Sequence, residues 1–287
     1  MKPFGYHEPA TAAEACQCLK ELGEGARIIA GGTDILIQMK RGSRTPEHLV
    51  NISNMDELSR IESGPEGISI GTAVLLSALV DNQAINDSLP MIARAAYLVG
   101  SPQVRNLATI GGNICNAAPS ADMSPGLVAL DSVLTIVGPD GQRQLPISDF
   151  FTGPGSVALE HDEILTSIFI PKPEAGTKML YLKHGPRQAM DCSVTGVALA
   201  LCVDPQTRTC KNVRLVLGAV APTPVRARQA EQMIDGRRVD DIDFAAVGGS
   251  AASEASPISD VRSSAEYRLE MVSVLTVKAL ETLVQGV

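Results

Sequence analysis

Two glycine-rich segments contain the residues of this sequence that are best suited to hold a ligand. In the first, Gly31-Gly32 stands between Ala30 and Thr33-Asp34, and in the second, Gly111-Gly112 opens a polar stretch that ends at Asp122. Glycines lack Cβ atoms, so their backbone can approach an anionic ligand and direct N–H groups toward it. Two such segments predict a long anionic ligand that is held at both ends.

The second segment adds polar side chains at short intervals after its glycine pair. Asn113, Asn116, Ser120 and Asp122 supply amide, hydroxyl and carboxylate groups, which can bond ribityl or ribose hydroxyls as well as phosphate oxygens. From the residues alone, capping of local turns is the alternative role for these side chains. The pattern favours a ligand that carries both hydroxyl and phosphate groups.

Other sequence motifs for nucleotide binding and hydrolysis are missing. No Gly-x-x-x-x-Gly-Lys-Ser/Thr is present, and Gly153-Pro154-Gly155 follows Asp149-Phe150-Phe151 instead of a predicted strand, so neither a P-loop nor a dinucleotide fingerprint is predicted. There is no Gly-x-Ser-x-Gly, and the four histidines stand in no motif with a catalytic partner. We therefore expect a chain that holds a cofactor, whose own reactivity supplies the chemistry.

The six cysteines form no Cys-x-x-Cys and no metal-site spacing with the histidines. We predict that most of them are buried as small apolar residues. An iron–sulfur cluster needs four closely arranged thiolates or a Cys/His mixture, so any cluster that serves this protein is expected in another chain.

The composition describes a packed globular protein, with 45% hydrophobic and 20% charged residues. The net charge is −8 and no basic run exceeds two residues, so nucleic acid is not an expected partner. No apolar run approaches the length of a membrane span, and the first residues lack the pattern of a secretory signal. These features predict a cytoplasmic protein.

The expected elements mix helices and strands. A strand over residues 27–30 leads through the first glycine pair into a helix over 35–41, capped by Thr33 or Asp34. Further expected elements are a strand over 48–52, paired strands over 59–62 and 67–71, a helix over 85–99, the end of a short helix at 127–130, and a hairpin over 133–147.

The sequence around Pro171 to Gly176 is the best domain boundary and divides the chain into residues 1–175 and 176–287. Beyond it we expect long strands over 178–183, 194–203 and 212–220, followed by helices. The last helix, over 266–284, carries an apolar stripe that suits either the core or a subunit contact. The whole is an α+β protein.

Both glycine segments, together with Asp260-Val261-Arg262-Ser263-Ser264-Ala265-Glu266-Tyr267-Arg268, resemble the FAD-binding medium subunit of molybdenum hydroxylases, the xanthine dehydrogenase and carbon monoxide dehydrogenase flavoprotein family. The resemblance spans essentially the whole chain. It implies a two-part FAD-binding domain of the vanillyl-alcohol oxidase and para-cresol methylhydroxylase (PCMH) type, followed by a small domain with a three-stranded antiparallel sheet and helices.

The resemblance also implies cofactor contacts. The FAD pyrophosphate would be wrapped by the backbone of Ile28, Ile29, Ala30, Gly31, Gly32, Thr33, Asp34 and Ile35. The opposite side would be formed by Ala108, Thr109, Gly112, Asn113, Cys115 and Asn116, and Asp122 would bond FAD hydroxyls. Leu165 would pack against the flavin ring and Lys183 would approach it from the second domain, although a surface lysine is an equal alternative.

The implied function is electron transfer through noncovalent FAD within a larger enzyme. A large molybdopterin subunit would oxidise the substrate, a small subunit would carry two [2Fe–2S] clusters, and the whole would form a dimer of heterotrimers. A self-contained flavin oxidoreductase and a nucleotide-binding regulatory protein are the alternatives. The substrate and the electron acceptor stay open, as does the cover of the flavin ring, because residues 187–192 contain no Tyr or Phe.

Overall fold

The computed structural model describes residues 1–187 and 189–285. Its N-terminal region is a small parallel sheet of order β1-β3-β2. Thr11 is the N-cap residue of helix α1, and its hydroxyl accepts a hydrogen bond from the Glu14 amide. The inner side of the helix packs on this sheet. The elements of the region are β1 (Gly5–His7), α1 (Ala12–Leu22), β2 (Ala26–Ile29), α2 (Ile35–Arg41) and β3 (His48–Asn51).

The central region is a five-stranded antiparallel sheet of order β4-β5-β10-β6-β7. Two hairpins, β4-β5 and β6-β7, form its edges. Strand β10 lies between the hairpins and pairs with β5 and β6. The predicted pairings of 59–62 with 67–71 and of 133–137 with 144–147 are confirmed. Its strands are β4 (Ile61–Gly64), β5 (Gly67–Gly71), β6 (Val133–Gly138), β7 (Gly141–Pro146) and β10 (Ile164–Pro171).

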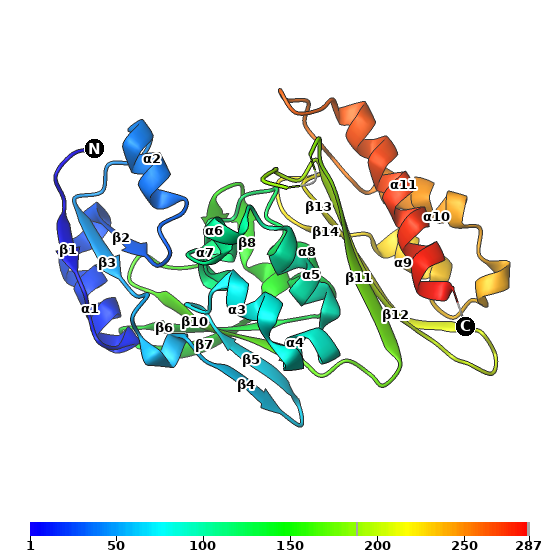
Figure 1. The fold of residues 1–287 in the computed structure, drawn as a ribbon, viewed down its shortest axis with the longest axis horizontal. Helices are drawn as coiled ribbons and strands as arrows, with labels where there is room; N and C mark the ends of the chain where they lie inside the picture. The colour runs from blue at the N-terminus through cyan, green and yellow to red at the C-terminus, as the bar shows by residue number, and fades with distance from the viewer. Residues whose placement is uncertain (188, 286–287) are drawn as a thin grey trace.

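Short helices cover the central sheet (Figure 1). The helix expected over residues 85–99 is instead two helices, because Leu89 precedes Pro90 and a residue before proline is disfavoured in the helical conformation. The helices are α3 (Leu76–Asp81), α4 (Gln83–Ser88), α5 (Pro90–Leu98), α6 (Pro102–Arg105), α7 (Ile110–Cys115) and α8 (Met123–Ala129). Residues 153–155 form a turn between β8 (Phe151–Gly153) and β9 (Ser156–Val157), as expected for a loop.

The C-terminal sheet has four strands in the order β11-β12-β13-β14, which corrects the expected three. The three long strands are found where the sequence predicted them, and β14 adds two residues that pair with Val216 and Leu217. Strand β14 follows Pro224 directly and is too short to show the alternation of apolar and polar residues from which a strand is predicted. The elements are β11 (Thr177–His184), β12 (Thr195–Val203), β13 (Cys210–Gly218), β14 (Val225–Arg226), α9 (Arg228–Ile234), α10 (Phe244–Ser253) and α11 (Ala265–Val284).

The long strands β11 to β13 stand between the central helices and α9 to α11 (Figure 1). Successive side chains of a strand point to opposite faces. On β11, Met179 and Tyr181 join the core of the central region, whereas Leu180 and Leu182 pack with the C-terminal helices. The sheet therefore belongs to two hydrophobic cores. Leu280 and Leu283 of α11 lie in the second one, so the stripe of the last helix is core.

The cysteines are less buried than predicted. Cys16, Cys202 and Cys210 are buried, Cys18 and Cys115 are half-buried, and Cys192 is exposed. The described residues contain no group of three or more Cys, His, Asp or Glu side chains placed to hold a metal ion. Over the same residues, no helix combines the length and apolarity that crossing a membrane requires.

Candidate cofactor-binding site

The first glycine segment connects the end of β2 to the start of α2. Gly32 has φ +69°, a backbone conformation that glycine adopts without strain, and its carbonyl accepts a hydrogen bond from the Leu36 amide. Asp34 is the N-cap residue of α2, but its side chain makes no capping hydrogen bond, so the expected cap by Thr33 or Asp34 is wrong. Asp34 is exposed by surface area, although desolvation by the surrounding protein still raises the pKa of its carboxyl.

The backbone amides of this segment have no partners within the chain. For Gly31, Gly32, Thr33 and Asp34, no hydrogen bond from the N–H group to any described residue is present. Four successive donors at the end of a strand and the beginning of a helix form a concave arrangement that suits an anion. Because α2 has only seven residues, we attribute the suitability of this segment for an anion to the run of free amides and not to a helix dipole.

The second glycine segment uses its backbone differently. Thr109 caps α7 and accepts a hydrogen bond from the Gly112 amide through its side chain, at 3.0 Å. The Ile110 and Gly111 amides donate to the carbonyls of Val74 and Thr72, at 3.0 and 2.9 Å. The first amides of α7 are therefore satisfied inside the protein, by Thr109 and by the segment that follows β5.

The first glycine segment lies directly against Leu107 and Ala108, which lead into the second. A Cβ atom on Gly31 would lie 1.7 Å from the carbonyl oxygen of Leu107, so only glycine allows the backbones to come this close. A Cβ on Gly111 would lie 2.5 Å from the Thr72 side chain, whereas one on the exposed Gly112 would meet only the Thr109 hydroxyl, at 3.0 Å. Gly31 and Gly111 thus serve close packing within the protein, and Gly112 borders open space.

Polar side chains of the second segment lack partners within the protein. The Asn113 Oδ1 atom is fully buried and accepts no hydrogen bond from any described residue. The side chains of Asn116 and Ser120 also make no hydrogen bond within the described chain. A buried amide oxygen without a donor is costly, so a ligand that donates a hydrogen bond to it would lower the free energy. Hydroxyls of a ribityl or ribose unit fit this requirement.

Several other predicted contact residues flank these segments along the chain. Ile28 and Ile29 belong to β2, Ile35 begins α2, and Ala108 is buried just before α7. Burial raises the pKa of the Cys115 thiol to about 12, which keeps it protonated and chemically inert at neutral pH. Contact of these residues with FAD stays a prediction.

Leu165 lies in β10 at an irregularity of its pairing with β6. Its side chain is 2% exposed, and its carbonyl accepts a hydrogen bond from the Thr72 hydroxyl at 2.8 Å. Thr72 thereby connects Leu165 to the second glycine segment. The predicted packing of Leu165 on a flavin ring stays a prediction.

Asp122 and Lys183 are brought together by the tertiary structure. The Lys183 Nζ atom lies 2.7 Å from Asp122 Oδ2, and both side chains are buried, so the alternative of a surface lysine is wrong. Lys183 also donates to the carbonyls of Leu98 and Asp191, at 3.1 and 2.9 Å. Tyr181, which the sequence analysis missed, donates its hydroxyl to Asp122 Oδ1 at 3.0 Å.

The segment that follows β11 is the one in which the sequence lacks an aromatic residue. Gln188 lies outside the described residues, and Met190 is exposed. Asp191 accepts a hydrogen bond from the Arg187 amide. The cover of a flavin ring at this place stays open.

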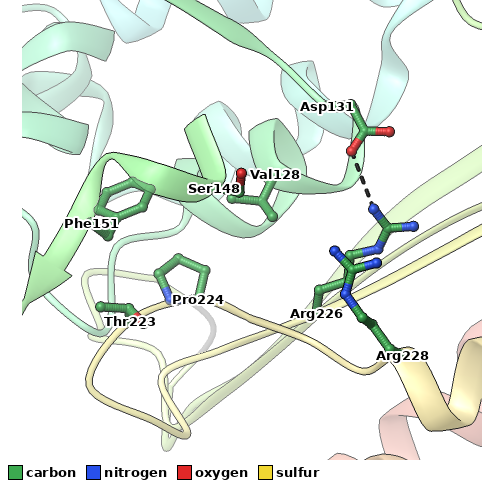
Figure 2. A pocket seen from close by; sticks show the side chains of 8 residues that line it. All are labelled: Val128, Asp131, Ser148, Phe151, Thr223, Pro224, Arg226 and Arg228. Atoms are coloured by element: carbon green, nitrogen blue, oxygen red, sulfur yellow. Dashed lines mark hydrogen bonds and ion pairs between the residues drawn. The ribbon is translucent and has the colours of Figure 1, made fainter. Parts of the chain in front are cut away.

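A separate cavity of about 320 Å³ lies at the other end of α8 (Figure 2). It is formed between the central region and the turn before β14, and Asp131 there pairs with Arg226 and also with Arg214. No residue of either glycine segment lines it. Its lining residues are Val128, Asp131, Ser148, Phe151, Thr223, Pro224, Arg226 and Arg228.

The four free amides of one glycine segment and the unpartnered amide and hydroxyl side chains of the other suit an extended, anionic, hydroxyl-rich cofactor. Two family models match the chain, and both agree with a cofactor of this kind. One is the FAD binding domain in molybdopterin dehydrogenase, over residues 2–173, and the other is the CO dehydrogenase flavoprotein C-terminal domain, over residues 181–283. The chain belongs to this family of FAD-binding subunits.

Individual relatives agree with the family over nearly the whole chain. The sequence is 37% identical to a xanthine dehydrogenase FAD-binding subunit of Escherichia coli O157:H7, over 96% of this chain and 94% of that protein. It is 33% identical to the carbon monoxide dehydrogenase medium chain of Afipia carboxidovorans, over 97% and 96%. Among solved structures, reconstituted CO dehydrogenase from Oligotropha carboxidovorans matches with a TM-score of 0.95 at 31% identity, over 100% and 99%.

Proposed function

We propose that this chain carries FAD and passes electrons from [2Fe–2S] clusters of a partner subunit to an external acceptor. The observation that carries the proposal is the run of unpartnered amides from Gly31 to Asp34, beside the residues that lead into the second glycine segment. FAD can receive electrons singly and release them in pairs, which suits a junction between clusters and a two-electron acceptor.

The residues present fit the two chemically different parts of FAD. The free amides from Gly31 to Asp34 suit the pyrophosphate, because they are donors without acceptors. Asn113, Asn116 and Asp122 suit the hydroxyl groups, because they offer acceptors close to one another along the second segment. In this proposal Leu165 borders the flavin ring and Lys183 acts from the C-terminal sheet.

We further propose the assembly that the family implies. A large molybdopterin subunit oxidises the substrate, a small [2Fe–2S] subunit relays electrons, and two such heterotrimers form a dimer in the cytoplasm. The proposal also includes a PCMH-type fold for residues 1–175 and a separate C-terminal domain from residue 176.

Purification of the protein with its partners tests this function. We expect flavin absorbance that is released by denaturation as free FAD, and bleaching of that absorbance when the molybdenum subunit receives its substrate. Colourless protein that binds no added FAD would overturn the proposal. Turnover of a substrate by the isolated chain would favour the alternative, a self-contained flavin oxidoreductase.

A further inference from the structure

A buried polar cluster joins the C-terminal sheet to the end of the second glycine segment. It consists of Asp122, Tyr181 and Lys183, which are defined here as the Asp122 cluster. Asp122 is 5% exposed and Tyr181 2% exposed, and the side chain of Lys183 is 8% exposed. Both carboxylate oxygens of Asp122 accept hydrogen bonds from β11, one from the Tyr181 hydroxyl and one from the Lys183 ammonium.

The geometry of strand β11 places the Tyr181 hydroxyl beside Asp122. Met179, Tyr181 and Lys183 alternate along β11 and therefore share the face toward the central region. Gly196, on the neighbouring strand β12, leaves space for the tyrosine, because a Cβ atom there would lie 2.6 Å from the hydroxyl oxygen. The tyrosine ring packs in the apolar core, so the position of its hydroxyl is fixed.

Asp122 is free to serve a purpose other than capping. It is the N-cap residue of α8, yet its side chain makes no hydrogen bond to that helix. An ionised carboxylate has about four lone-pair sites. Two protein donors occupy two of them, so the carboxylate retains capacity for a hydroxyl of a bound ligand.

Electrostatics makes the two β11 residues necessary to the carboxylate. Burial raises the pKa of Asp122, and the charge of Lys183 and the hydrogen bonds from Lys183 and Tyr181 oppose that rise. Burial and the neighbouring Asp122 raise the pKa of Tyr181 well above its ordinary value, so its hydroxyl stays a donor. On the loop after β11, the Asp191 carbonyl faces Lys183, while the Asp191 carboxylate is engaged by Arg187.

We propose that Tyr181 is a positioning residue of the cofactor site, which acts on FAD through the Asp122 carboxylate. The inference rests on the proposed function, in which Asp122 accepts a hydrogen bond from an FAD hydroxyl. Tyr181 holds one carboxylate oxygen and thereby fixes the direction of the other lone pairs. Because Tyr181 belongs to the C-terminal sheet, packing of that sheet on α8 and binding of FAD stabilise each other.

The test is FAD titration of the apoprotein, between pH 5 and pH 8, for wild type and Tyr181→Phe. We expect roughly three- to tenfold weaker binding at pH 8 for the variant, because the Asp122 carboxylate loses a donor that holds it in position for the cofactor. Loss of a donor raises the pKa of Asp122, so the carboxylate of the variant becomes protonated at a higher pH. As the pH is lowered, the FAD affinity of the variant should therefore fall earlier than that of wild type. Tyr267→Phe is the matched control, because Tyr267 is exposed and its hydroxyl bonds His184.

Two further variants make the test decisive. Gly196→Ala keeps the Tyr181 hydroxyl but displaces it, and should reproduce both effects even if Tyr181→Phe does not fold. In an Asp122→Asn background, Tyr181→Phe should no longer shift the pH profile, because the titrating group is gone. Unchanged affinity and pH profile in a folded Tyr181→Phe or Gly196→Ala protein would overturn the inference. Failure of wild type to bind FAD would instead overturn the proposed function.

Discussion

The two glycine segments resemble each other in sequence and differ in what their backbones do. In the first, the amides of Gly31 to Asp34 have no partner among the described residues, whereas in the second the Ile110 to Asn113 amides all donate within the protein. The first segment therefore offers backbone donors and the second offers side chains. A glycine pair next to polar residues indicates close approach, but the approaching group can be a ligand or another part of the chain.

Substitution of Gly31 should have the largest effect and tests whether that glycine serves the protein itself. In Gly31→Ala the new Cβ would overlap the Leu107 carbonyl, which requires a backbone shift. We expect a loss of about 3 kcal/mol or more in the free energy of unfolding of the apoprotein. Denaturant unfolding measures it, with Gly153→Ala as control because a Cβ there meets no atom within 4 Å. Equal stability of the two variants would contradict the packing role.

Substitution of Gly112 should separate ligand binding from stability. Gly112→Val places a side chain in the space beside α7, where only the Thr109 hydroxyl lies close. We expect FAD retention to be abolished, while the midpoint of unfolding of the apoprotein changes little. Flavin absorbance of the purified protein and thermal unfolding measure the two effects. A folded Gly112→Val protein with normal flavin content would show that the second segment does not border FAD.

Removal of the unpartnered Asn113 side chain should have a smaller effect, again confined to the bound form. Asn113→Ala deletes a buried oxygen that has no donor in the apoprotein, so apoprotein stability should not fall. FAD binding should weaken by about 1 to 3 kcal/mol if that oxygen accepts a hydroxyl of the cofactor. Isothermal titration with FAD measures the change. A large loss of apoprotein stability with unaltered affinity would assign Asn113 to the protein interior instead.

Asp260, in the loop before α11, should show the smallest effect and provides a reference outside both segments. Hydrogen bonds from the Arg262 amide and from Arg268 lower the pKa of its carboxyl to about 2. A lowered pKa stabilises the folded state above the ordinary carboxyl pKa, and this contribution is lost as the pH falls from about 4 toward 2. Asp260→Asn should lower the unfolding temperature slightly at pH 7, with a difference from wild type that shrinks below pH 4. FAD affinity should stay unchanged.

Local sequence was sufficient for most elements and for the choice of the segments that form the candidate site. The glycine pairs, the hairpin over 133–147, the three long C-terminal strands and the last helix follow from turn residues and periodicity. The wrong predictions also have local causes. Pro90 divides one predicted helix, Asp34 stands at a helix start without capping it, and β14 is too short to show a pattern.

Within the candidate site, the residues that sequence reasoning missed are those whose role depends on a distant partner. In the sequence, Tyr181 is an ordinary strand residue. The only signals for its buried hydroxyl are its alternation with Lys183 and the glycine at position 196. Lys183 alone could equally have been a surface residue. Its burial against Asp122 requires β11 to pack on α5 beside the start of α8, which no local pattern specifies.

The sequence by itself determined which chemical groups are available, since residue types and their spacing decide where a backbone is bare and where amides and hydroxyls gather. Only the tertiary structure decided which of these groups are free. The amides of Gly111 and Ile110 are used because residues 72–74 lie beside them, and those of the first segment are free because no acceptor does. A hydrogen bond satisfies a donor whatever the distance along the chain, so the open donors of a site become known only when the chain is folded.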